Sequence, residues 1–257
     1  MTLAGGLLAG YGFSVMAFHP DTVQPHAVPS PHAPRLDVEG PRPARGLEGF
    51  QPRRALVCQL RQIGDVILAT ASLELLARRF PAAELHVLTE ARCAPILAHN
   101  PRVARVWALD KAAHRDPRQA WAFYRELARQ NFDLAVDFQQ LPRCRLAMLF
   151  TWAKVRLSHT PPWYNRLLYT HHTPAPDVYA GACKASVLSP LGIAWDGQPP
   201  RIYLTPAERA WAADTLREHG LDLSIPHDLP PPQGSHGPPR RTLVSVDPTH
   251  RRPARRW

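Results

Sequence analysis

Three polar stretches of this sequence carry residue types that could perform acid–base or phosphate chemistry. The first is RQIGD at residues 61–65, with Arg61, Gln62, Gly64 and Asp65; the second is DFQQLPR at 137–143, with Gln139 and Arg143. The third is DPTHRRPARRW at 247–257, with Thr249, His250, Arg255 and Arg256. A carboxylate can take a proton from a hydroxyl group, and guanidinium groups bind phosphate oxygens through paired hydrogen bonds.

Each of these residues also has a purely structural interpretation. Asp65 stands before an apolar-periodic segment, where an aspartate commonly caps the start of a helix. Gln139 could satisfy backbone groups of its loop, and Arg143 could be a solvated residue at a helix start. The arginines of the third stretch could equally form a solvated surface. Spacing alone leaves both interpretations open.

The elements that must position these residues follow a regular order from residue 54 onward. Apolar runs at 55–60, 84–89, 103–109 and 134–138 predict strands. Helical periodicity or composition predicts helices at 66–80, 91–99, 120–128, 143–158 and 178–191, and a capping box at Thr205–Glu208 predicts another that ends at Gly220. Alternation of strands and helices predicts an α/β fold, a doubly wound parallel sheet of the Rossmann-like kind. Ligands of such sheets bind beyond the carboxyl ends of the strands.

Composition limits the classes of partner and site. The chain of 257 residues has a net charge of +10, which predicts a polyanionic partner: nucleic acid, an acidic membrane surface or a phosphorylated substrate. Its four cysteines form no C-x-x-C pair, so we expect free thiols of a reduced cytoplasm. The 13 histidines form no H-E-x-x-H pattern, and we expect no metal site.

The 29 prolines cluster and so predict the domain boundaries. Residues 1–53 are expected to be a poorly ordered, Pro-rich extension; its apolar start is short for a membrane span and lacks a signal peptide's basic residues. Residues 54–225 form the Rossmann-like domain, and 226–239 form a Pro-rich interdomain linker. Residues 240–257 then look like the truncated start of a second α/β domain.

The three polar stretches, taken in order, resemble glycosyltransferase family 9, the ADP-heptose:lipopolysaccharide heptosyltransferases. Residues 55–111 are similar to the start of that family's N-terminal domain, with an I-G-D-V loop at 63–66. The stretch AVDFQQLPRCR resembles its D-x-Q-G-N-x-R-S segment at Asp137, Gln139 and Arg143, although Gln140 and Leu141 replace Gly and Asn. The stretch VSVDPTHRRPARRW resembles the opening of its C-terminal domain, with Arg255 in place of a usual Lys.

The resemblance implies an inverting, metal-independent glycosyltransferase of the two-domain GT-B kind, of which this chain holds the N-terminal, acceptor-binding half. It implies that Asp65 is the catalytic base. Acceptor binding would fall to Arg61, Gln62, Gly64, Gln139 and Arg143, and donor-phosphate binding to Thr249, His250, Arg255 and Arg256. The substrates would be ADP-heptose and a lipopolysaccharide inner-core acceptor, with no cofactor, in the cytoplasm or peripherally on the inner membrane. Without most of a donor domain, the chain as given is expected to be inactive.

Two other classes of function compete with this interpretation. One is a non-catalytic, flavodoxin-like module that binds a phosphorylated or anionic ligand. The other is a nucleic-acid binder, which the charge favours, although no predicted strand carries interleaved aromatic and basic residues.

Overall fold

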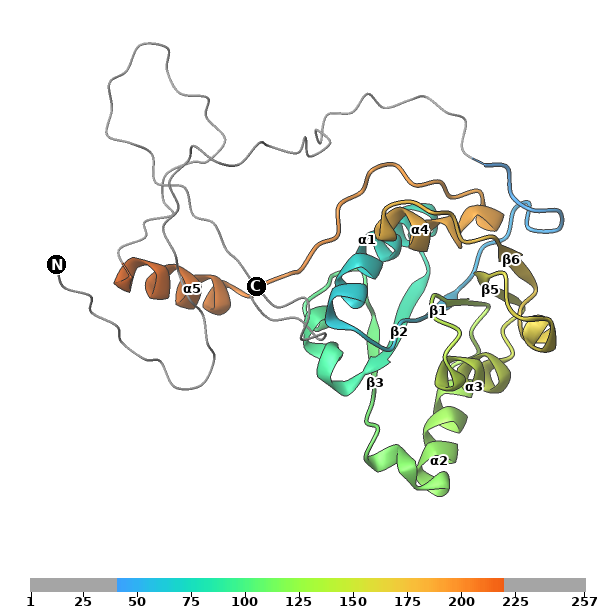
Figure 1. The fold of residues 1–257 in the computed structure, drawn as a ribbon, viewed down its shortest axis with the longest axis horizontal. Helices are drawn as coiled ribbons and strands as arrows, with labels where there is room; N and C mark the ends of the chain where they lie inside the picture. The colour runs from blue at the N-terminus through green and yellow to red at the C-terminus, as the bar shows by residue number, and fades with distance from the viewer. Residues whose placement is uncertain (1–40, 220–257) are drawn as a thin grey trace, which may run out of the picture. The chain divides into compact units, whose positions relative to one another are not determined.

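A six-stranded, all-parallel sheet forms the centre of the computed structural model, which describes residues 41–219 (Figure 1). The strands lie in the order β3-β2-β1-β4-β5-β6. Their bounds are Arg54–Cys58 (β1), Glu84–Glu90 (β2), Arg105–Leu109 (β3), Leu134–Asp137 (β4), Val155–His159 (β5) and His171–Thr173 (β6). The order reverses between β1 and β4, the kind of switch point at which doubly wound sheets bind their ligands. The predicted Rossmann-like α/β fold is confirmed.

Helices cover both faces of the sheet. The α-helices are Ile63–Arg79 (α1), Pro117–Ala128 (α2), Pro142–Thr151 (α3), Ala180–Ser186 (α4) and Pro206–Glu218 (α5). Short 3-10 helices are Ala91–Leu97 (η2), Ala113–Arg115 (η3), Trp163–Leu168 (η4) and Ser189–Leu191 (η5). Helix α1 and the α4 segment contribute to one apolar cluster, whereas α2 and α3 contribute to the other.

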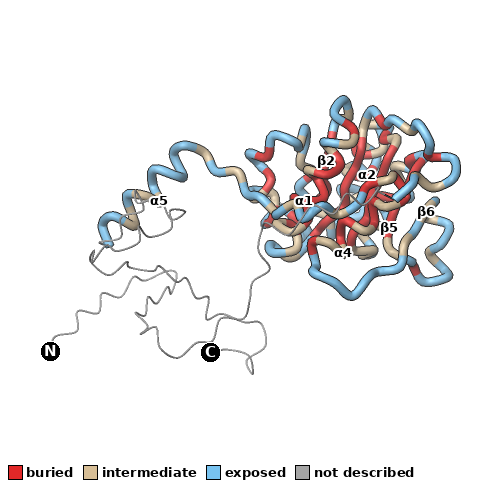
Figure 2. The backbone as a smooth tube through the Cα atoms, turned by 90° about the horizontal axis from the view of Figure 1, so that it is seen from above, coloured by how far each residue is buried: buried red, intermediate tan, exposed pale blue. Residues whose placement is uncertain are grey.

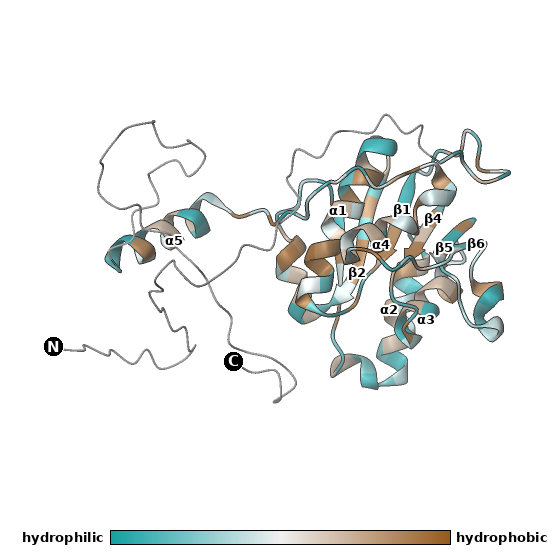
Figure 3. Ribbon diagram, turned by 45° about the horizontal axis from the view of Figure 1, so that its top comes forward, coloured by the Kyte–Doolittle hydropathy of each residue, from teal (hydrophilic) through white to brown (hydrophobic). Residues whose placement is uncertain are grey.

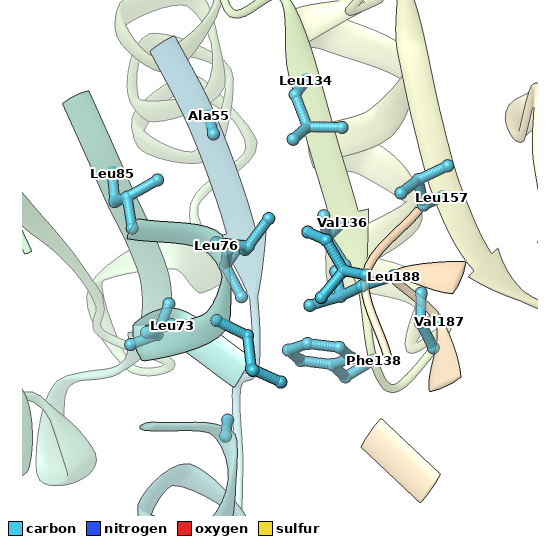
Figure 4. Packing of buried hydrophobic residues seen from close by; sticks show 14 of the residues in the cluster. Ala55, Leu73, Leu76, Leu85, Leu134, Val136, Phe138, Leu157, Val187 and Leu188 are labelled. Carbon is cyan, nitrogen blue, oxygen red and sulfur yellow. The ribbon is translucent and has the colours of Figure 1, made fainter. Parts of the chain in front are cut away.

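The two apolar clusters explain why the central strands read as short apolar runs. Strands β1 and β4 are buried on both faces, so neither face tolerates a regular polar alternation. Figure 4 shows one cluster, in which Leu73 and Leu76 of α1 face Val136, Phe138 and Leu188. Buried residues concentrate along the strands and the helix sides that face them (Figure 2), and hydrophobic residues follow the same elements (Figure 3).

The helix predicted over 143–158 is wrong in its second half. Helix α3 ends at Thr151 because Trp152 takes a left-handed conformation (φ 41°, ψ 41°), and the chain then forms β5. In β5, Val155 and Leu157 are buried and contribute to the apolar cluster shown in Figure 4, not to the one that α3 contacts. The periodicity of a short apolar segment does not separate a buried strand from a helix, and tertiary burial decided this one.

The start of α1 differs from the capping interpretation of Asp65. The N-cap residue is Gln62, which makes no side-chain capping hydrogen bond, and Asp65 lies inside the first turn. A carboxylate in the first turn still interacts favourably with the positive end of the helix dipole. The side chain of Asp65 is therefore not used to cap the backbone.

Residues 41–50, assigned from sequence to the extension, pack against the sheet domain where the structure describes them. Leu47 is 6% exposed, and the ring of Phe50 meets that of Phe80 edge-on at 6.4 Å between centroids. The backbone N–H of Ala44 donates to Pro190 O at 2.9 Å. Nearby, Gly192 ends η5 with a φ of +75°, as expected for the glycine after a helix.

Two further expectations are answered by the described residues. The capping box at Thr205 and Glu208 is present at the start of α5, a helix with no buried residues. All four cysteines are free. Separately, no helix in the described range is both long and apolar enough to cross a membrane. Residues 1–40 of the extension, with its apolar start, lie outside the described residues, as do the linker at 226–239 and the segment 240–257.

Candidate active site

The first two polar stretches meet because the strands that precede them are neighbours. Strands β1 and β4 pair in parallel, and Cys58 lies opposite Asp137 at their carboxyl ends. The loop 59–62 and the loop 138–141 therefore leave the sheet side by side. We call this part of the sheet its carboxyl edge.

Two glutamine side chains hold the loop that leads to Asp65. Gln139 Oε1 accepts from the backbone N–H of Leu60 (2.9 Å) and from that of Arg61 (3.2 Å), and Gln139 Nε2 donates to Arg61 O. Gln59 Nε2 donates to the same carbonyl at 2.8 Å. With its backbone secured in this way, Arg61 leaves its side chain exposed.

Lys184 connects this loop to Asp65. Its Nζ lies 3.1 Å from Asp65 Oδ1 and donates to Gln59 Oε1 at 3.0 Å. The Lys184 side chain is 11% exposed, whereas that of Asp65 is 37% exposed. Burial of an ammonium group is costly unless its charge is compensated and its protons are bonded, and these two partners supply both. The outer part of the Asp65 carboxylate remains accessible from solution.

Asp137 organises the neighbouring loop from a fully buried position. Its Oδ1 accepts from the backbone N–H groups of Gln139 (2.9 Å) and Gln140 (2.8 Å), and its Oδ2 accepts from the Tyr169 hydroxyl (2.7 Å). Burial raises the pKa of Asp137, and the hydrogen bonds to the carboxylate oppose the rise in part. Burial also raises the pKa of Tyr169 above its ordinary value. Asp137 is thus a structural residue that shapes the loop carrying Gln139.

The structure accounts for the unusual Gln140. This residue has a φ of 51°, the left-handed region in which glycine is favoured, and Gly is the residue that the resemblance leads one to expect here. The loop thus keeps a glycine-like backbone, and Gln140 Nε2 donates to His159 O at 2.7 Å. Gln140 in place of the expected Gly therefore changes the side chain at this position, while the backbone has the left-handed conformation that suits a glycine.

The remaining predicted residues are placed as follows. Gln62 precedes α1, and Gly64 is its second residue, exposed, with open space where a Cβ would be. Arg143 is the second residue of α3; among the described residues, its buried Nη1 has no hydrogen-bond partner. The predicted donor-phosphate group lies outside the described residues: Thr249, His250, Arg255 and Arg256.

Sequence reasoning missed Gln59 and Lys184. Gln59 is the one polar residue within the apolar run 55–60, and a polar side chain at that place was a usable signal. Lys184 is a single cation among small residues in AGACKAS, the sequence of α4. Only the packing of α4 against α1 brings this cation to Asp65.

The arrangement offers a held carboxylate, with an exposed guanidinium group nearby in the chain. Such a carboxylate can accept a proton from a hydroxyl group bound at the carboxyl edge. Within residues 41–219, no group of three or more His, Cys, Asp or Glu side chains has a geometry suited to a metal ion.

Comparison with known proteins adds a sequence relationship. No family model matches the chain. Over 141 residues it is 26% identical to lipopolysaccharide heptosyltransferase 3 of Escherichia coli, a match that spans 52% of this chain and 42% of that protein. The chain is heptosyltransferase-like. This is the relationship to glycosyltransferase family 9 that the polar stretches predicted.

The heptosyltransferase-like chain also shares a fold with a solved structure. A glycosyl transferase of family 9 from Veillonella parvula superimposes with a TM-score of 0.56 at 22% identity, over 67% of this chain and 51% of that one. ADP-heptose lps heptosyltransferase II of E. coli gives a TM-score of 0.47 at 18% identity, over 67% of this chain and 52% of that one. The chain thus spans about half the length of the proteins it matches.

Proposed function

We propose that this chain is the acceptor-binding half of a heptosyltransferase that moves a heptose from ADP-heptose to a lipopolysaccharide inner-core acceptor. The observation that carries the proposal is the held carboxylate of Asp65, at the carboxyl edge of a Rossmann-like sheet and paired with Lys184. The sequence relationship to a lipopolysaccharide heptosyltransferase supports heptosyl transfer as the reaction class and lipopolysaccharide as the kind of acceptor.

In the proposed reaction, Asp65 is the general base. Its carboxylate takes the proton of an acceptor hydroxyl group while that oxygen forms a bond to the anomeric carbon of the heptose. The bond from this carbon to the diphosphate breaks, ADP leaves with the electron pair, and the configuration inverts. The step balances without a metal or a redox cofactor. Lys184 acts through Asp65 as a positioning residue, because it limits the orientations available to the carboxylate.

Arg61 and Arg143 are suited to the anionic groups of an inner-core acceptor. Arg61 has an exposed guanidinium group on a loop whose backbone is secured by Gln59 and Gln139. Arg143, at the start of α3, has a buried guanidinium nitrogen without a partner in the described part of the chain. Guanidinium groups bind phosphates and carboxylates in paired geometry. Gly64, the neighbour of Asp65 in the chain, is exposed, and an added Cβ there would meet nothing within 4 Å.

The donor side of the proposal rests on Thr249, His250, Arg255 and Arg256. These residues would bind the diphosphate of ADP-heptose and offset the charge that grows on it as the bond breaks. The reaction would take place in the cytoplasm, at the inner surface of the membrane that holds the acceptor.

A binding measurement on the 257-residue chain tests the acceptor side. Calorimetry with a deacylated, phosphorylated inner-core oligosaccharide should show binding, which Arg61→Ala and Arg143→Ala each weaken several-fold. Arg217→Ala, a change of an exposed arginine on α5, should leave it unchanged. Binding that ignores Arg61 and Arg143 would contradict their assignment.

A transfer assay tests the chemistry. In a protein that joins this chain to a nucleotide-sugar-binding domain, release of ADP and gain of heptose by the acceptor are measured together. Asp65→Asn should abolish transfer, by at least about a thousandfold, while oligosaccharide binding persists. Normal transfer by this variant would refute the role of Asp65. Binding without transfer by the unmodified protein would favour the flavodoxin-like binding module instead.

A further inference from the structure

Large apolar side chains are exposed on α3, the residue that follows it and η4. Five of them are more than half exposed. They are Leu149 (51%), Trp152 (57%), Trp163 (81%), Tyr164 (63%) and Leu167 (88%). We call this set the Trp163 surface.

Contacts of Arg156 tie the two parts of this surface together. The Arg156 guanidinium lies over the Trp152 ring, 4.2 Å from its centroid, and its Nε donates to Leu168 O at 2.7 Å. The rings of Trp163 and Tyr164 meet edge-on, 5.7 Å apart. Helix α3 and η4 are in contact, and Figure 1 shows them at one side of the sheet. The two parts of the Trp163 surface therefore lie on elements that are in contact and are linked through Arg156.

The stretch of sequence that carries this surface has basic residues but no acidic ones. Between Asp137 and Asp177 the sequence contains no Asp or Glu. Over the same range it carries five basic residues: Arg143, Arg145, Lys154, Arg156 and Arg166. Arg166 and Lys154 are exposed beside the Trp163 surface, one within η4 and one two residues after Trp152.

We propose that the Trp163 surface docks on a lipid bilayer with anionic headgroups. Trp and Tyr side chains prefer the boundary between headgroups and acyl chains, and leucines gain from burial there. Nearby lysines and arginines are attracted to anionic lipids. A second copy of the chain is a poorer occupant, because two cationic surfaces repel each other. Nucleic acid would satisfy the arginines but leave Leu149 and Leu167 without apolar partners.

This inference stands apart from the proposed chemistry and does not rest on it. Helix α3 carries Arg143 in its first turn and is followed by Trp152, about 14 Å further along at 1.5 Å per residue. Leu149 and Trp152 thus lie toward the opposite end of α3 from Arg143, whereas Trp163 comes four residues after the carboxyl end of β5.

Vesicle sedimentation with the full chain tests the inference. Binding to phosphatidylcholine vesicles that contain phosphatidylglycerol is expected, with much weaker binding to phosphatidylcholine alone. The double variant Trp163→Ala/Leu167→Ala should lose at least about tenfold in affinity, since it removes two apolar anchors. Arg166→Glu should lose several-fold. Brominated lipids should quench tryptophan fluorescence, and less so in the double variant.

Matched controls lie on α5. Trp211 is 70% exposed, so Trp211→Ala removes an equally accessible tryptophan, and Arg209→Glu reverses an exposed charge. Both should bind vesicles as the unchanged chain does, and all variants should show the same thermal unfolding. The inference is overturned if Trp211→Ala weakens binding as much as the double variant. It is also overturned if the Trp163 surface instead supports binding to a DNA or RNA oligonucleotide, or a dimer that the double variant dissociates.

Discussion

Lys184 Nζ lies 3.1 Å from Asp65 Oδ1, and the lysine is much the more buried partner of this pair. The pair joins the first turn of α1 to α4, two helices that pack together on one face of the sheet. Because the ammonium group is enclosed, removing either partner has a different consequence. Loss of the Asp65 carboxylate leaves a buried positive charge uncompensated, whereas loss of Lys184 leaves a carboxylate that water can still reach.

A double-mutant cycle should therefore show strong coupling within this pair. We expect Asp65→Asn and Lys184→Met each to lower the free energy of unfolding, with a coupling energy of about 1–2 kcal/mol. Urea unfolding followed by circular dichroism measures all four proteins. The exposed pair Arg217–Asp214 on α5, 2.5 Å apart, is the matched control and should show about 0–0.5 kcal/mol. Equal coupling in both pairs would mean that Lys184 is not enclosed.

Asp137 should make stability depend on pH in an identifiable way. Burial raises its pKa, so the folded chain holds the proton more tightly than the unfolded chain does. Its contribution is complete below the unfolded pKa, near 4, and is lost as pH rises through the folded pKa. Between these two values, stability should fall by up to about 1.4 kcal/mol per pH unit.

Two substitutions of Asp137 separate charge from hydrogen bonding. Asp137→Asn can still accept from Gln139 and Gln140 and can donate to Tyr169, so it should fold and lose that pH dependence. Asp137→Ala leaves the same three groups without an acceptor, and should cost about 2–4 kcal/mol at every pH. Chemical unfolding of the unchanged chain and the two variants from pH 4 to 8 measures the free energy of unfolding of each as a function of pH. An unchanged pH slope in the Asn variant would rule out Asp137 as its source.

Gln140 should tolerate glycine far better than a branched residue. Gln140→Gly relieves the left-handed backbone but removes the bond to His159 O, so the two effects of about 1 kcal/mol each should nearly cancel. Gln140→Val increases the backbone strain, because a β-branched residue tolerates the left-handed region poorly, and it also removes the hydrogen bond to His159 O. It should be about 2 kcal/mol less stable than the Gly variant. Thermal unfolding of the two variants and the unchanged chain measures both differences in stability. Gln51→Val, at an exposed glutamine without a positive φ, should change little.

The packing of residues 41–50 can be tested with a pair of glycines. Gly192 and Gly197 both have left-handed φ values, +75° and +81°. A Cβ on Gly192 would lie 3.1 Å from Pro41 O and 3.1 Å from Pro43 Cγ, whereas one on Gly197 would meet nothing within 4 Å. Gly197→Ala should cost about 1 kcal/mol for backbone strain alone, and Gly192→Ala about 1 kcal/mol or more beyond that. Equal losses in thermal unfolding would show that the 41–43 segment does not lie against Gly192.

The sequence by itself determined the class of fold and placed two polar stretches at its carboxyl edge. Strands that are buried on both faces are mostly apolar, which is why the sequence predicted the strands at 55–60, 84–89 and 134–138. Polar residues that follow such runs lie at the ends of the strands. The order of the three polar stretches was enough to predict the relationship to heptosyltransferases. The capping box at Thr205 could be predicted from sequence because all its hydrogen bonds are local.

Only the tertiary structure decided which side chains meet. Lys184 reaches Asp65 because α4 packs on α1, and Gln139 secures the Arg61 backbone because β1 and β4 are neighbours. The strand nature of 155–159 likewise depended on its pairing with β4, since a short apolar run satisfies a helix or a strand equally well. Such contacts depend on elements far apart in the chain, and periodicity carries no information about them.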